Sequence, residues 1–142
     1  MIQLITGTKG RGKTKILLDK VNTAVYDAKG NIAYLDKSNK HMHELKRKIL
    51  LINVKSYLVD NSEEFLGFIC GIISQDHDLE AIYIDSFLKI SHLECKDSKH
   101  LIPMFEKLAK ISDMYKVEFI ISISCSEDEL PDTLKKYVVV LL

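Results

Sequence analysis

The sequence predicts an α/β domain in which a mainly parallel sheet of five strands lies between two layers of helices. Short apolar runs alternate with helical segments along all 142 residues, of which 46% are hydrophobic. The runs lack a regular polar alternation, which is typical of strands that are buried on both faces. Chains that alternate in this way form parallel sheets through right-handed crossovers, with helices on each side. We therefore expect a single domain that spans residues 1–142.

The amino-terminal part predicts a strand, a helix and a second strand. Ile2 to Thr6 is a short apolar, β-prone run that stops at a cluster of glycines. The segment from Thr14 to Asp27 spaces its apolar residues as a helix does, and Gly30 follows as a breaker. Asn31 to Leu35 then reads as a second buried strand, which Asp36 closes.

The middle of the chain predicts one clear helix. His41 to Lys48 favours a short polar helix, and Leu51 to Val54 a short strand that we do not count among the five. Asn61 and Glu64 have the spacing of a capping box. They open a helix that we expect to continue to about Gln75.

The last part of the chain predicts the remaining three strands. Ala81 to Asp85 is the third strand, and Val117 to Ser124 the fourth. Between them, Pro103 suits the first position of a helix that reaches Tyr115. Ser126 and Glu129 form a second capping box and open a short helix. Residues 137–142 supply the fifth strand.

Composition restricts the partners and the compartment. Twenty basic and twenty acidic side chains cancel, so no global field recruits nucleic acid or anionic lipid. Cys70, Cys95 and Cys125 are far apart and form no CxxC pair, which argues against a disulfide framework or a zinc site. The longest apolar run is far shorter than the about twenty residues of a membrane span. We expect a cytoplasmic protein with no membrane partner.

Gly7 to Thr14, GTKGRGKT, matches the pattern GxxxxGK[ST] in full. Glycines let such a loop wrap with its amides pointing inward, and the following helix adds its free N–H groups and positive dipole end. Lys13 would bridge the β- and γ-phosphates, and the Thr14 hydroxyl would bind Mg²⁺. The predicted nucleotide contacts are Gly7, Thr8, Lys9, Gly10, Arg11, Gly12, Lys13, Thr14 and Lys15.

Asp85 ends the third strand, where an acid can hold Mg²⁺ through water. With the glycine-rich loop, this makes the chain resemble a P-loop NTPase of the branch that includes RecA-like and AAA-type ATPases. The resemblance implies the sheet order 5-1-4-3-2, and it implies ATP and Mg²⁺ as ligands. The chain also resembles a small family of clostridial ATP-binding proteins.

The chain departs from that family pattern after Asp85. Ser86 stands where a glutamate commonly polarises the attacking water, and a serine needs help to act as a base. Asp36 is a candidate catalytic acid at the end of the second strand, or else a solvated turn residue. Ser122 and Ser124 share one face of the fourth strand and are candidate sensors of the γ-phosphate, or are satisfied locally. Glu94, in a loop, is a further candidate base.

We expect an ATP-binding protein, with slow Mg²⁺-dependent hydrolysis that serves a protein partner or a homo-oligomer. A small-molecule kinase is the first alternative, although Arg11 and Arg47 are the only arginines for a lid or a finger. A GTPase switch would need an Asn-Lys-x-Asp motif, and the string at Asn39 and Lys40 lacks the aspartate. The fourth hypothesis is an interaction module that binds nucleotide without turnover.

Overall fold

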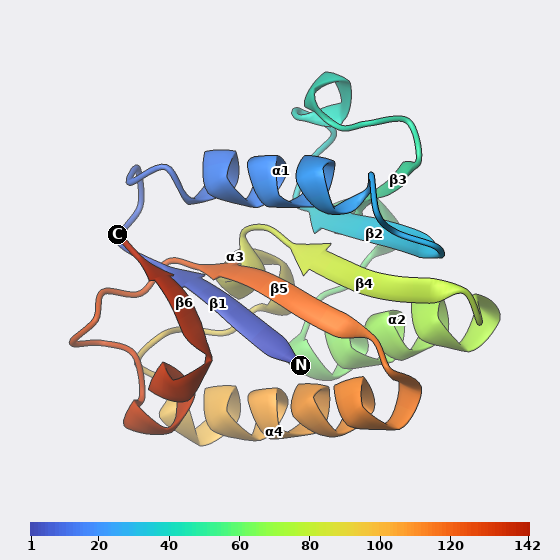
Figure 1. Cartoon of the computed structure of the whole chain (residues 1–142). Coiled ribbons are helices and arrows are strands. Elements are labelled where there is room, and N and C mark those ends of the chain that lie inside the picture. Colours follow the sequence, from blue (N-terminus) through green and yellow to red (C-terminus); the bar gives the residue numbers. More distant parts are fainter.

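The computed structural model describes residues 1–142 and contains a six-stranded, all-parallel sheet between helical layers (Figure 1). The strands are β1 (Ile2–Thr6), β2 (Asn31–Asp36), β3 (Ile49–Asn53), β4 (Leu79–Ile84), β5 (Glu118–Ile123) and β6 (Val138–Leu141). The α-helices are α1 (Lys13–Ala24), α2 (Ser62–Gln75), α3 (Phe87–Ser91) and α4 (Ser98–Tyr115). Short 3-10 helices occur at Met42–Glu44, Val54–Tyr57 and Asp132–Tyr137.

The α/β class and the parallel sheet are confirmed, but the strand count is six and not five. The order is β3-β2-β4-β5-β1-β6, so the predicted order 5-1-4-3-2 is extended by β3 at the edge beside β2. An edge strand is only half covered, and Leu50 in the middle of β3 is exposed. The short strand expected from Leu51 to Val54 does form, as Ile49–Asn53, and the error lies in leaving it out of the sheet.

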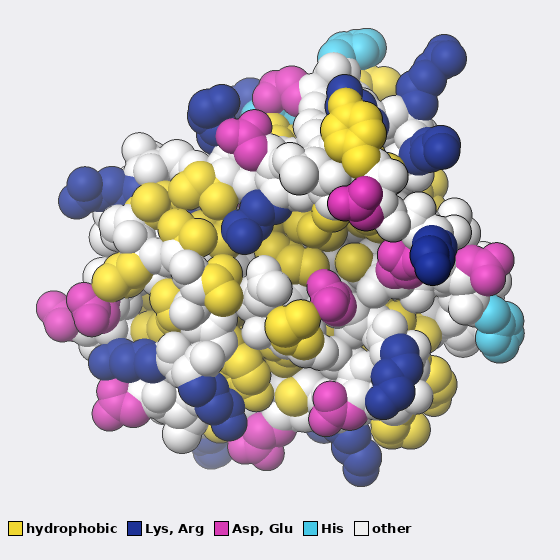
Figure 2. All heavy atoms as spheres, viewed as in Figure 1, with side chains coloured by type: hydrophobic (Ala, Val, Ile, Leu, Met, Phe, Trp, Pro, Cys, Tyr) yellow, Lys and Arg dark blue, Asp and Glu magenta, His cyan; other side chains and the backbone are white.

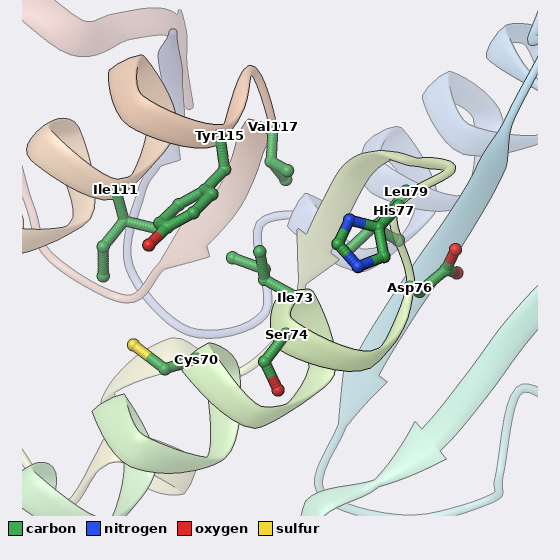
Figure 3. A pocket seen from close by; sticks show the side chains of 9 residues that line it. All are labelled: Cys70, Ile73, Ser74, Asp76, His77, Leu79, Ile111, Tyr115 and Val117. Atoms are coloured by element: carbon green, nitrogen blue, oxygen red, sulfur yellow. The ribbon is translucent and has the colours of Figure 1, made fainter.

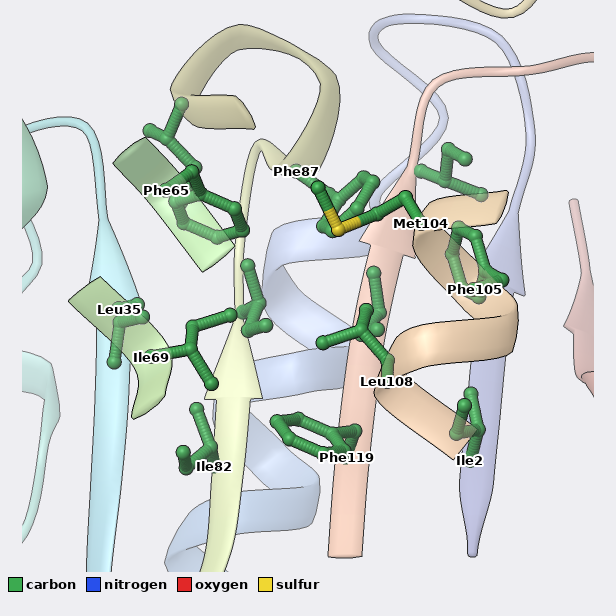
Figure 4. Close-up of a cluster of buried hydrophobic side chains, with 14 of the residues drawn as sticks. Ile2, Leu35, Phe65, Ile69, Ile82, Phe87, Met104, Phe105, Leu108 and Phe119 are labelled. Atoms are coloured by element: carbon green, nitrogen blue, oxygen red, sulfur yellow. The ribbon is translucent and has the colours of Figure 1, made fainter. Parts of the chain in front are cut away.

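Two hydrophobic clusters hold the helices to opposite faces of the sheet. α1 covers one face through Leu17 and Val21, while α2, α3 and α4 cover the other (Figure 1). On that second face, Phe87 lies between Phe65 and Phe105, with ring centroids 5.8 Å and 5.3 Å apart (Figure 4). Truncation of a buried phenylalanine to alanine costs about 3–5 kcal/mol, so α3 is anchored although it is short.

Helix boundaries agree with the sequence at α2 but not at α4. The Asn61 side chain accepts a hydrogen bond from the Glu64 amide at 2.8 Å, as the capping box predicts. α4 begins at Ser98, so the prediction that Pro103 is its first residue is wrong. Proline inside a helix leaves the carbonyl four residues earlier without its donor. That carbonyl belongs to Lys99, which is exposed and can bond water instead.

The expected helix after Ser126 does not form. Ser126 and Glu129 make the reciprocal side-chain to backbone hydrogen bonds of a capping box, at 3.3 Å and 3.2 Å. Pro131 then disfavours the helical conformation of the residue before it, so the turn stops and a 3-10 helix follows. The polar helix expected from His41 to Lys48 is likewise reduced to three 3-10 residues.

Cys95 and Cys125 form a disulfide, although the wide spacing of the cysteines argued against a disulfide framework. Their Cα atoms lie 5.9 Å apart although 30 positions separate them in sequence. The fold brings the segment after α3 beside the end of β5, and no spacing rule reveals this contact. Cys70 is free and exposed.

Charged side chains of both signs are mixed over the face of the molecule seen in Figure 2, in keeping with the formal net charge of zero. No helix has both the length and the apolar character required to cross a bilayer.

Candidate functional site

A cavity of about 430 Å³ lies at the carboxyl edge of the sheet, where ligands of open parallel sheets usually bind. It is formed by the segments that follow β1, β2, β4 and β5. Its lining residues are Lys9, Gly10, Gly12, Lys13, Thr14, Lys37, Asp85, Ser86, Leu88, Lys89, Ser122 and Ser124. The fold therefore brings the predicted loop, the strand-end acid and both sensor serines around one space.

The glycine-rich loop depends on backbone conformations that favour glycine. Gly12 precedes α1 with φ 93°, in the left-handed region. At Gly7, φ is 153° and an added Cβ would lie 2.9 Å from Cβ of Leu142. Side chains are strained at both positions, and at Gly7 they also collide with the carboxy-terminal residue. The two glycines thus fix the path of the loop from β1 into α1.

The backbone amides of this loop have no partners within the chain. The Gly7 N–H donates to the Cys125 carbonyl at 3.0 Å, and the next amide that donates is that of Ile16. None of the amides from Thr8 to Lys15 donates a hydrogen bond to another protein atom, and no side chain caps the start of α1. A row of free donors at a helix amino terminus attracts anions.

Lys13 is held inside the loop. Its side chain is 8% exposed, and Nζ donates to the Thr8 carbonyl at 2.9 Å. Burial lowers the pKa of Lys13, and the charge of Asp85 opposes this shift. A cation is thus directed into the space that the free amides surround.

Asp85 is 3% exposed, and its carboxylate is fixed by neutral donors. Oδ1 accepts the Ser122 hydroxyl at 2.6 Å and the Ser86 amide at 2.9 Å, while Oδ2 accepts the Tyr34 hydroxyl at 3.1 Å. Burial, followed by the charge of Asp85, raises the pKa of Tyr34, which keeps its hydroxyl a donor. Asp85 and Thr14 line the same cavity, as the magnesium hypothesis requires.

Ser122 and Ser124 both line the cavity, in line with their shared face on the strand. The Ser122 hydroxyl is already committed to Asp85 and also accepts the Ser86 amide at 3.2 Å. Ser122 is therefore buried and satisfied locally, whereas Ser124 is exposed and free to meet a ligand.

Asp36 is neither a cavity residue nor a solvated turn residue. It is 2% exposed and absent from the cavity lining. Its Oδ1 accepts the Lys37 amide at 2.7 Å, while its buried Oδ2 has no partner. Burial, reinforced by the charge of Asp85, raises the pKa of Asp36. A carboxyl enclosed in this way has no path to a substrate in the cavity.

The other charged candidates also lie away from the cavity. Glu94 and Arg47 are exposed and do not line it. Arg11 stays within the loop, where its Nε donates to the Thr8 hydroxyl at 3.4 Å. No group of three or more His, Cys, Asp or Glu side chains is arranged to hold a metal.

Sequence reasoning missed three residues of this site. Tyr34, which supports Asp85, resembles any other core residue of an apolar strand. Lys89 lies on α3, a helix too short for a periodic signal, and Lys37 directly follows the strand-end acid. The position of Lys37 after a buried strand was a usable signal, because loops at strand carboxyl ends form the sites of such sheets.

A second cavity of about 370 Å³ lies at the opposite, amino-terminal edge of the sheet (Figure 3). The ends of α2 and α4 and the starts of β4 and β5 surround it, with Ile73, Tyr115 and Val117 among its lining residues. It contains none of the residues that the sequence identified as candidates, and it is mostly apolar.

No protein-family model matches the chain, and a search of curated proteins finds no significant match.

Proposed function

We propose that the chain is a P-loop nucleotide-binding protein that takes ATP with Mg²⁺ between the glycine-rich loop and Asp85. The single observation that carries this proposal is the row of free amides from Thr8 to Lys15 around the buried ammonium of Lys13. Most of these amides belong to exposed residues, so they can bond water when no ligand is present and remain available to an anion at the start of the helix. Phosphate oxygens satisfy both the amides and the cation.

Each residue of the site has a role in this proposal. Lys13 exchanges the Thr8 carbonyl for the β- and γ-phosphate oxygens, and Thr14 offers its hydroxyl to Mg²⁺. Asp85 orients water of the ion, because both carboxylate oxygens already carry hydrogen bonds from the protein. The ion supplies charge neutralisation at the phosphates when bound.

The strand order supports the RecA/AAA-like branch of P-loop NTPases. β5 lies between β1, which carries the loop, and β4, which carries Asp85, and β2 lies beyond β4. Ser86 still replaces the glutamate of that branch, and the buried Asp36 does not take its place. We therefore propose binding with slow hydrolysis rather than fast turnover.

The test is a titration of a fluorescent ATP analogue with Mg²⁺ into wild type, Lys13→Ala and Lys20→Ala. Loss of a buried cation that contacts phosphate should weaken binding at least tenfold. Lys20→Ala removes the same charge from the same helix away from the cavity, and it should bind like wild type. Equal affinities in all three proteins would remove the phosphate site from consideration.

Phosphate release separates the alternatives for the same site. Release by the protein alone or with a partner supports an ATPase, whereas ATP use only after a metabolite is added supports a kinase. Tight binding without release under every condition supports an interaction module.

A further inference from the structure

The cavity carries more positive charge than the loop alone contributes. Lys9, Lys13, Lys37 and Lys89 line it, while Asp85 is its only acidic residue. Lys13 and Lys9 belong to the glycine-rich loop. Lys37 comes from the end of β2, and Lys89 from α3 after β4.

Lys37 and Lys89 are placed together without a counter-ion. Both line the same cavity, and the nearby Lys37 ammonium is the main cause that lowers the pKa of Lys89, with the charges of Lys9 and Lys55 adding to it. None of these four lysines forms an ion pair with an acid. Like charges that line one cavity repel each other, so this arrangement favours an anion between them.

The nearby carboxylates do not neutralise the pair. Asp85 uses both oxygens for Ser122, Ser86 and Tyr34. Asp36 is adjacent to Lys37 in sequence, but it is buried and does not line the cavity. The chain as a whole has no net charge, so the excess is local to this cavity.

Lys37 and Lys89 follow strands other than the one that carries the loop: Lys37 comes directly after β2, and Lys89 lies on α3 after β4. β4 and β5 separate β2 from β1, which amounts to three strand spacings, or about 14 Å. The free amides that would hold the inner phosphates belong to the β1 side. Lys37 therefore lines the cavity from the side of β2, away from those amides, and Lys89 lines it between Lys37 and the loop, where the charge of Lys9 still acts on it.

We propose that Lys37 and Lys89 form a second anion site, which binds a phosphate group beyond those held by the loop amides. This inference rests on the proposed nucleotide site. Two flexible ammonium groups suit a tetrahedral, multiply charged anion. The phosphate group belongs either to the terminal position of the nucleotide or to a separate phosphorylated ligand, and the chemistry of recognition is the same.

The experiment uses calorimetry on the full chain at 0.15 M salt, with three ligands. They are MgADP, a non-hydrolysable MgATP analogue, and inorganic phosphate titrated into protein saturated with either nucleotide. The variants are Lys37→Ala/Lys89→Ala, the charge-preserving Lys37→Arg/Lys89→Arg, and the control Lys107→Ala/Lys110→Ala, which removes two exposed lysines from α4. Lys13→Ala reports on the nucleotide site separately.

The alanine pair should bind MgADP within about threefold of wild type, since only screened charge is lost there. If the ligand is the terminal phosphate of the nucleotide, the preference of the alanine pair for the MgATP analogue over MgADP should be at least tenfold smaller than that of wild type. If a separate ligand is bound, wild type saturated with the analogue should still bind phosphate, and the alanine pair should bind it at least tenfold more weakly. The arginine pair and the α4 control should keep the wild-type response.

The proposal of a second anion site would be overturned if the alanine pair kept both the wild-type preference for the MgATP analogue and the wild-type response to phosphate. This holds whatever its affinity for MgADP. A loss of MgADP binding in the alanine pair as large as that in Lys13→Ala would also overturn it, because the lysines would then belong to the first site. Failure of wild type to bind MgADP would instead count against the proposed function.

Discussion

The bond between Cys95 and Cys125 should contribute several kcal/mol to the free energy of unfolding. The bridge joins positions 30 residues apart, and closing a loop of that length in the unfolded chain is worth about 3.7 kcal/mol at 25 °C in the chain-entropy model. With a urea m-value of about 2 kcal/mol/M, reduction should lower the midpoint of unfolding by roughly 2 M.

The measurement is urea unfolding of one protein, Cys70→Ala, with and without reductant. This background removes the exposed third thiol and with it any exchange between cysteines. A serine at position 125 would place a hydroxyl where Cys125 is fully buried. The comparison of oxidised and reduced forms of one sequence avoids that substitution. Identical midpoints, or two free thiols in the unreduced unfolded protein, would refute the reasoning.

Three further substitutions test the site and its supports. Asp85→Ala leaves the buried hydroxyls of Tyr34 and Ser122 without their acceptor, which should lower the free energy of unfolding by about 1–3 kcal/mol for each. The same variant should lose Mg²⁺-dependent nucleotide binding. Stability is measured by urea unfolding, and a variant as stable as wild type would contradict the network. Gly7→Ala should lower the free energy of unfolding by about 1–3 kcal/mol, because the backbone is strained there and the new Cβ meets Leu142. At the control position Gly67 a new Cβ has no atom within 4 Å, so Gly67→Ala should raise the free energy of unfolding by up to about 1 kcal/mol. Equal melting temperatures of the two variants would contradict the contact with Leu142. The pKa of Asp36 is raised in the folded state, so the native protein holds a proton that the unfolded chain releases above its ordinary value of 3.8, and stability falls as pH rises from there. Asp36→Asn should therefore gain stability relative to wild type as the pH rises above about 4. A difference that does not change with pH would exclude this linkage.

Local signals in the sequence were sufficient for the loop and for most of the sheet. Gly7 and Gly12 have conformations that few other residues adopt, so their spacing with Lys13 carries the geometry of the loop in the sequence itself. Asp85 could be placed because a buried run ends at an acid. A short strand was expected near β3, but a four-residue apolar run does not show that it joins the sheet beside β2.

The features that were missed depend on contacts between distant segments. Tyr34 supports Asp85 across neighbouring strands, and Lys37 and Lys89 line one cavity only after β2 and β4 have paired. The bond from Cys95 to Cys125 likewise needs the end of β5 beside the segment after α3. These residues are far apart in the sequence, so no local pattern predicts that they lie together. Their proximity follows from the tertiary fold alone.

The position of β1 inside the sheet has a consequence for synthesis on the ribosome. β1 is made first, yet it pairs only with β5 and β6, with Ile2 opposite Phe119 and Thr6 opposite Leu141. Its backbone groups therefore have no strand partners until the carboxy-terminal segments have emerged. β2, β3 and β4 can pair earlier. The glycine-rich loop follows β1, so its position is fixed only when β1 has paired with β5 and β6. A nascent chain of this protein should therefore order its glycine-rich loop only after β5 and β6 have been made.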